Sequence, residues 1–196
     1  MARSKIGALT VDPIKDSGSV LLSLVKGEQL EQAVTLSFSS NVLAGYVYEA
    51  VVVEAANQVG QSSPPADMQP GGVQTTLTVR VPTYRGVWDS AQAYNMEEIV
   101  YYNSKYYRLT TGVARVSNTP PSSDNTWSET TANRLYIQFP STLGSAWTVQ
   151  PGTTYHSYGF FELRVTESGS SLFKRTWKPV RGMVEIQFSP TELVPG

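Results

Sequence analysis

The chain has 196 residues, a formal net charge of −1, no cysteine and a single histidine. The absence of cysteine excludes disulfide bonds, thiol nucleophiles and cysteine-ligated metal centres. The near-neutral charge provides no general attraction to nucleic acid or to anionic lipid, and no apolar run reaches the roughly 18 residues of a membrane-spanning helix. We therefore expect no cofactor, no metal, no nucleic-acid partner and no membrane insertion. Charged residues also interrupt the N-terminus, so we expect no export by a signal peptide.

Residues 1–17 are mixed in composition and predict an N-terminal arm. From residue 20 onward, apolar and polar residues alternate, which is typical of strands with one buried face. The segment 46–54 is apolar on both faces and predicts a central strand, whereas the Pro- and Gly-rich segment 56–72 predicts a long exposed loop. No segment repeats apolar residues at helical spacing over a full helix. The chain is therefore predicted to be all-β, with strands spaced as in a sandwich.

The segment 84–129 differs from its flanks because it concentrates aromatic residues, while the flanks are rich in Val, Leu, Thr and Ser. This change predicts a small aromatic-rich module at 84–130, inserted into one discontinuous β-sandwich formed by 18–82 and 133–191. Neither flank supplies enough strands to fold alone, and insertions are tolerated at loop tips whose ends lie close together.

The aromatic order in this segment is Trp88, Tyr94, a hairpin over 99–107, Pro120-Pro121 and Trp127. It resembles the chitinase-type carbohydrate-binding modules. The resemblance implies that Trp88, Tyr94, Tyr107 and Trp127 form the framework of the module. In chitin-binding relatives an exposed Trp pair follows the hairpin, whereas this chain has Leu109-Thr110-Thr111 there.

Three tyrosines of the hairpin provide a different candidate for a glycan platform: Tyr101, Tyr102 and Tyr106. Successive strand residues point to opposite faces, so at least one tyrosine of each adjacent pair should point outward. Sugars stack their apolar faces on such rings. The alternative is that these rings belong to the core of the module.

The remaining chain resembles the immunoglobulin-like domain of tailed-phage baseplate upper proteins and related virion proteins. The resemblance rests on the segments 26–28, 43–48, 149–155 and 177–190. It implies an immunoglobulin-like sandwich in a structural, non-enzymatic virion protein of the tail, baseplate or fibre, or in a capsid decoration. Expected partners are other virion proteins, further copies of the chain and a cell-surface glycan contacted by the module. The alternative function is a carbohydrate-binding protein acting chiefly in glycan adhesion.

Two further groups of residues are candidates for a contact or for chemistry. The basic cluster Lys174, Arg175, Lys178 and Arg181 fits either a solvated strand face or a contact with an acidic neighbouring subunit. A hydrolase would depend on His156 as its imidazole base, or on Glu97 and Glu98, whose side chains should diverge in a hairpin. We therefore expect no catalytic residues.

Overall fold

The computed structural model describes residues 9–11, 19–37, 43–56, 69–111, 115–116, 118–143, 145, 147, 156–168 and 175–187. The strands are β1 (Leu9–Val11), β2 (Ser19–Val25), β3 (Leu30–Leu36), β4 (Tyr46–Ala56), β5 (Gln69–Arg80), β6 (Thr83–Val87), β7 (Ala93–Tyr94), β8 (Glu98–Tyr102), β9 (Lys105–Leu109), β10 (Arg115–Val116), β11 (Trp127–Thr130), β12 (Arg134–Phe139), β13 (His156–Glu167) and β14 (Thr176–Gln187). A 3₁₀ turn, η1, covers Leu43–Gly45. The all-β prediction is confirmed.

Eight strands form one continuous sheet in the order β1-β3-β12-β5-β4-β13-β14-β2. The sheet curls around a single core, to which both β3 and β2, from opposite ends of this order, contribute buried side chains. The twelve-residue strand β5 makes the sheet continuous, because its first part pairs with β4 and its last three residues pair with β12. The sequence predicted an immunoglobulin-like sandwich of separate sheets, and that detail stays a prediction.

The alternation in the sequence explains which side chains enter this core. In β2, Leu22 and Leu24 are buried, while Leu21 and Val25 are 52% and 43% exposed. Strands β1 and β2 form the two edges, each paired in parallel with its neighbour. Part of the predicted N-terminal arm, Leu9–Val11, is thus an edge strand of the large sheet.

The predicted loop at 56–72 is shorter than expected, because Gln69–Gly72 belong to β5. Gln69 and Pro70 pair with Ala56 and Ala55 beyond a register shift in β4. Gly72 permits close approach of the two strands, since an added Cβ would lie 2.6 Å from the carboxylate of Glu54. The remainder of the predicted loop lies outside the described residues.

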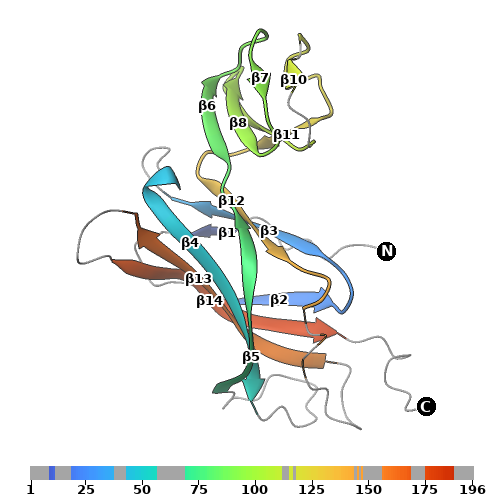
Figure 1. Ribbon diagram of the computed structural model, residues 1–196, viewed down its shortest axis with the longest axis vertical. Coiled ribbons are helices and arrows are strands. Elements are labelled where there is room, and N and C mark those ends of the chain that lie inside the picture. Colours follow the sequence, from blue (N-terminus) through green and yellow to red (C-terminus); the bar gives the residue numbers. More distant parts are fainter. Residues whose placement is uncertain are drawn as a thin grey trace.

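The chain leaves the large sheet after Arg80 and rejoins it at Arg134, although Arg80 and Tyr136 are direct partners in adjacent antiparallel strands. The intervening module stands at one end of the large sheet (Figure 1) and contains a four-stranded sheet, β11-β9-β8-β6, and the short pair β10-β7. It has a core of its own. The module therefore occupies the position of a hairpin loop between β5 and β12.

Candidate functional site

The four predicted framework residues lie in or against the core of the module. Tyr94, Tyr107 and Trp127 are 1%, 7% and 6% exposed, and Trp88 packs against them. The Tyr94 and Trp127 rings meet edge to face, with centroids 5.5 Å apart. The backbone N–H of Asp89 donates a hydrogen bond to the Tyr94 hydroxyl at 2.7 Å, which satisfies the polar end of a buried ring.

The three predicted platform tyrosines do not share one face of the module sheet. Tyr102 packs against the core and meets Trp88 edge to face, with ring centroids 5.3 Å apart. Tyr101 and Tyr106 are direct cross-strand partners on the opposite face. Strand alternation places Tyr101 and Tyr102 on opposite faces, so Tyr101 and Tyr106 lie together away from the core while Tyr102 does not, and glycan binding by these tyrosines stays a prediction.

A third tyrosine, Tyr84 of β6, joins Tyr101 and Tyr106. We call the face of the module sheet that carries these three residues the tyrosine face. Ring centroids are 5.9 Å apart for Tyr84 and Tyr106 and 5.0 Å for Tyr101 and Tyr106, with interplanar angles of 61° and 55°. Tyr84 is 41% exposed. Partial burial is the largest cause that raises the pKa of Tyr84, followed by the nearby Tyr106 and Tyr101. The parallel pairing of β6 with β8 brings Tyr84 to the same face as Tyr101 and Tyr106. No local pattern in the sequence predicts this pairing.

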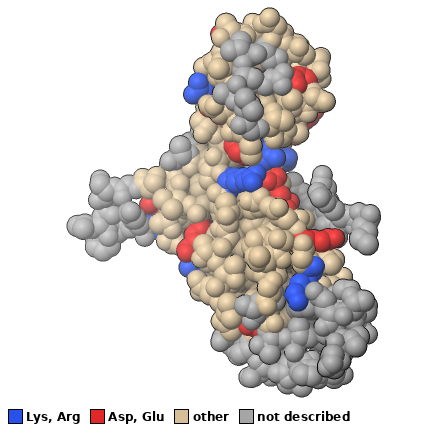
Figure 2. Space-filling view, turned by 45° about the vertical axis from the view of Figure 1, so that its right-hand side comes forward, with Lys and Arg blue, Asp and Glu red and all other residues tan. Residues whose placement is uncertain are grey.

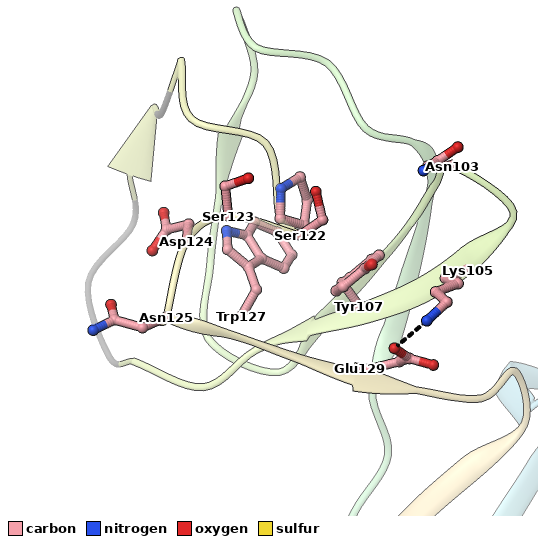
Figure 3. Close-up of a pocket in the computed structure, with 10 residues that line it drawn as sticks. Asn103, Lys105, Tyr107, Ser122, Ser123, Asp124, Asn125, Trp127 and Glu129 are labelled. Carbon is pink, nitrogen blue, oxygen red and sulfur yellow. Dashed lines mark hydrogen bonds and ion pairs between the residues drawn. The ribbon is translucent and has the colours of Figure 1, made fainter.

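The core-side face of the module sheet carries an open groove of about 680 Å³ (Figure 3). Asn103 and Lys105 of the β8–β9 hairpin lie on one side, and the turn 121–125 lies on the other. Tyr107 and Trp127 lie between these two sides and form the floor. Sequence reasoning identified both floor residues as framework but did not predict a groove above them.

An ion pair marks the rim of this groove. Lys105 Nζ lies 2.7 Å from Glu129 Oε2, and both side chains are more than half exposed. The hydrogen bond to Glu129, followed by its charge, raises the pKa of Lys105. The pair links neighbouring strands β9 and β11 and places a donor beside an acceptor.

Backbone and side-chain hydrogen bonds hold the opposite wall in place. Asp124 Oδ1 accepts hydrogen bonds from the Thr126 N–H at 3.0 Å and from its hydroxyl at 2.7 Å. The Thr126 carbonyl accepts from the N–H of Thr110 at 2.9 Å and from its hydroxyl at 2.8 Å. The Ser123 N–H donates to the Pro120 carbonyl at 2.9 Å. The wall is therefore formed before any ligand binds.

The hairpin that supplies the other side turns through two residues with positive φ, Asn103 at 47° and Ser104 at 64°. Two such residues are the signature of a type I′ turn, which matches the twist of the flanking strands. The Asn103 position on the rim is thus set by the turn type.

Four charged residues connect the module to the large sheet. Arg108 of β9 lies 3.2 Å from Glu97 and 3.3 Å from Glu31 of β3. Arg80, at the end of β5, approaches the same carboxylates at 3.4 Å and 3.5 Å. Charged residues of both signs gather at the narrowing between the two parts (Figure 2). We call these residues (Glu31, Arg80, Glu97 and Arg108) the junction cluster.

Aromatic and hydroxyl contacts reinforce the junction cluster. The guanidinium carbon of Arg108 lies 3.6 Å from the ring centroid of Tyr136 in β12, a cation–π contact. The hydroxyls of Tyr136 and Thr130 are 2.8 Å apart and both buried. Arg108, with only 12% of its side chain exposed, therefore contacts two carboxylates and one ring, from β3, β12 and the turn before β8.

Glu97 adopts the left-handed backbone conformation, with φ of 70°. A non-glycine residue in this conformation is strained by roughly 1–2 kcal/mol. The Glu97 N–H donates to the Leu109 carbonyl at 3.0 Å, and its carbonyl accepts from the Thr83 N–H at 3.2 Å. The strained backbone directs the carboxylate toward both arginines.

No protein-family model matches this chain, and a search of curated proteins gives no match. In the described part of the chain, no helix is long and apolar enough to cross a membrane. Among the residues that the structure describes, no group of three or more His, Cys, Asp or Glu residues could hold a metal ion.

The carboxylates considered for hydrolysis serve different contacts. Glu97 belongs to the junction cluster, whereas Glu98 is buried, accepts a hydrogen bond from the Asn95 N–H at 2.9 Å and lies 3.7 Å from Arg85. His156 is the first residue of β13, in the large sheet rather than in the module.

Two residues of the basic cluster, Lys178 and Arg181, pair with an acidic residue of their own chain. Lys178 Nζ and Arg181 Nε lie 2.9 Å and 3.7 Å from Glu162, which also accepts a hydrogen bond from Arg164. Burial raises the pKa of Glu162, but these cationic neighbours, Lys178 foremost, outweigh it and lower the pKa overall. Arg175 is exposed, and Lys174 lies outside the described residues. The subunit contact stays a prediction.

Proposed function

We propose that this protein is a non-enzymatic structural component of a tailed-phage virion. Its large domain, of immunoglobulin-like type, attaches to the particle, and the inserted module projects to contact a glycan on the host surface. Other virion proteins and further copies of the chain are its partners. It belongs to the tail, baseplate or fibre, or decorates the capsid.

One observation carries this proposal: the module replaces a hairpin loop between two adjacent strands of the large sheet. Arg80 and Tyr136 are paired across β5 and β12, yet the whole module lies between them in the chain. An element inserted in this way adds surface at one end of a domain without using the edges of its sheet. Among the described strands, β1 and β2 each have a neighbour on one side only, and such edges can pair with other subunits.

The junction cluster supports a projecting role, because it holds the module against the large sheet through several strands rather than through the two connecting segments alone. Glu31 and Tyr136 come from the large sheet, and Glu97 and Arg108 come from the module. A ligand-contacting module held in this way keeps a fixed orientation relative to the attached domain. The groove and the tyrosine face both lie on the module.

Purified particles of the phage that encodes this chain provide the test. We expect mass spectrometry to detect the protein in particles that have passed a density gradient, at a constant ratio to the major virion proteins. Antibodies raised against the module should label intact particles. Absence of the protein from purified particles, or its loss in a high-salt wash without loss of other structural proteins, would contradict the proposal.

A further inference from the structure

We propose that the groove between the β8–β9 hairpin and the turn 121–125 binds a neutral oligosaccharide. This inference rests on the proposed function, since it names the ligand class and the site for the glycan contact of the module. It places that contact away from Tyr101 and Tyr106, two of the three platform tyrosines predicted from the sequence, on the opposite face of the module sheet.

The groove has dimensions suited to a few sugar rings. Its volume of about 680 Å³ lies within the range of roughly 300–1,000 Å³ typical of ligand pockets. Its two sides come from separate chain segments, and it is open to solvent. Hydrogen bonds fix the wall at Asp124 and Thr126. A preformed wall lowers the ordering cost of binding.

The chemistry of the rim fits hydroxyl groups, which both donate and accept hydrogen bonds. Asn103 and Asn125 offer amides with both functions, while Lys105 and Glu129 place an ammonium donor 2.7 Å from a carboxylate acceptor. A donor and an acceptor this close match two neighbouring hydroxyls of one sugar ring. The serine hydroxyls of the turn add further partners.

The charge of the groove disfavours anionic ligands. Its lining has one basic side chain, Lys105, against two acidic ones, Asp124 and Glu129. Lys105 is paired with Glu129, and the lining as a whole has one more acidic than basic side chain, which disfavours a phosphate or a sialic acid. A neutral sugar meets no such repulsion.

The tyrosine face is less suited to stacking a sugar. A chain of sugars stacks best on rings that share one plane, whereas Tyr84 and Tyr101 are inclined to Tyr106 at 61° and 55°. The three rings therefore form no common flat surface. In the groove, Tyr107 and Trp127 are buried and provide an apolar floor, so hydrogen bonds at the rim carry recognition.

The test uses the full chain and a panel of tetrasaccharides of glucose, galactose, mannose and N-acetylglucosamine, with a phosphorylated and a sialylated oligosaccharide for comparison. Binding is followed by saturation-transfer NMR and titration calorimetry. We expect at least one neutral tetrasaccharide to bind, and the charged ones to bind more weakly. Asn125→Ala and Glu129→Gln should each reduce the affinity about fivefold to tenfold, the effect of one lost hydrogen bond.

Matched variants distinguish binding in the groove from binding elsewhere on the protein. Glu28→Gln, a surface change in the large domain, and Tyr84→Ala, on the tyrosine face, should leave the affinity unchanged. Lys105→Glu combined with Glu129→Lys retains an ion pair but exchanges donor and acceptor; it should preserve the unfolding temperature and still weaken binding. A merely structural role of the pair would leave binding intact in this double variant.

Three results would overturn the inference: no binding across the neutral panel, a preference for the charged sugars, or loss of binding in Tyr84→Ala while the groove variants keep their full affinity. None of these results bears on whether the protein is found in virions. Conversely, absence from purified particles would remove the proposed function and leave sugar binding by the groove as a property of the isolated protein.

Discussion

Substitutions of Glu97 separate two opposing effects at the junction between the module and the large sheet. Its backbone has φ of 70°, which disfavours every residue with a Cβ, while its carboxylate contacts Arg80 and Arg108. Glu97→Gly relieves the backbone and removes the carboxylate. Glu97→Ala removes the carboxylate and leaves the backbone strained.

The structure gives the order of stability. Glu97 accepts two charge-assisted contacts at 3.4 Å and 3.2 Å with 22% of its side chain exposed, so their loss should cost roughly 1–2 kcal/mol after allowance for solvent screening. In the Gly variant about 1 kcal/mol of this lost stability is recovered. Glycine relieves the backbone strain at positive φ, and this gain exceeds the extra backbone entropy that glycine loses on folding. We expect wild type to be the most stable and the Ala variant the least, with the Gly variant between them.

Urea unfolding at low and high salt, with hydrogen exchange of peptides covering β8 and β9, measures these differences. Raising the salt concentration should shrink the gap between wild type and the Ala variant, because it screens partly exposed charges. The gap between Gly and Ala is steric and should not change. Equal stability of the Gly and Ala variants would refute the role of positive φ, and a salt-independent gap between wild type and Ala would refute the role of the ion pairs.

Three further outcomes are expected. Ser104→Gly should stabilise the module by about 0.5–1 kcal/mol in urea unfolding, because Ser104 has φ of 64° in the hairpin turn; unchanged stability would argue against strain there. Gly159→Ala should lower the thermal unfolding midpoint and cost roughly 1–3 kcal/mol, because an added Cβ would lie 2.9 Å from the Val53 carbonyl oxygen and 2.5 Å from the Trp147 ring, and a tolerated alanine would show that the strands can separate there. The lowered pKa of Glu162 means that its contribution to stability is present above the ordinary glutamate pKa and is lost as the pH falls through the lowered value. The stability difference between wild type and Glu162→Gln should therefore shrink on acidification, and a pH-independent difference would contradict this sign.

Local patterns in the sequence were sufficient to predict several features of the fold. The alternation at Leu22 and Leu24 places both side chains in the large core, because successive strand residues point to opposite faces. The concentration of aromatic residues at 84–129 predicted a separate module, and Tyr94 and Trp127 are indeed buried together. Both features depend on residues that are near each other in the chain.

Pairing between segments distant in the chain decided how the strands join into one sheet and which tyrosines share a face. Strand β5 pairs with both β4 and β12, which joins what alternation alone would assign to separate sheets. Parallel pairing of β6 with β8 brings Tyr84 to the tyrosine face, while strand alternation removes Tyr102 from it.

The candidate site shows the same division between sequence and tertiary structure. The sequence by itself determined which residues are aromatic, which turn residues permit positive φ and which charges are available, because these are properties of single residues and their neighbours. Only the tertiary structure placed Lys105 beside Glu129 and Arg108 beside Glu31, residues 24 and 77 positions apart. The groove and the junction cluster exist because strand register brings such distant side chains within hydrogen-bonding distance, and register depends on the fold of the whole chain.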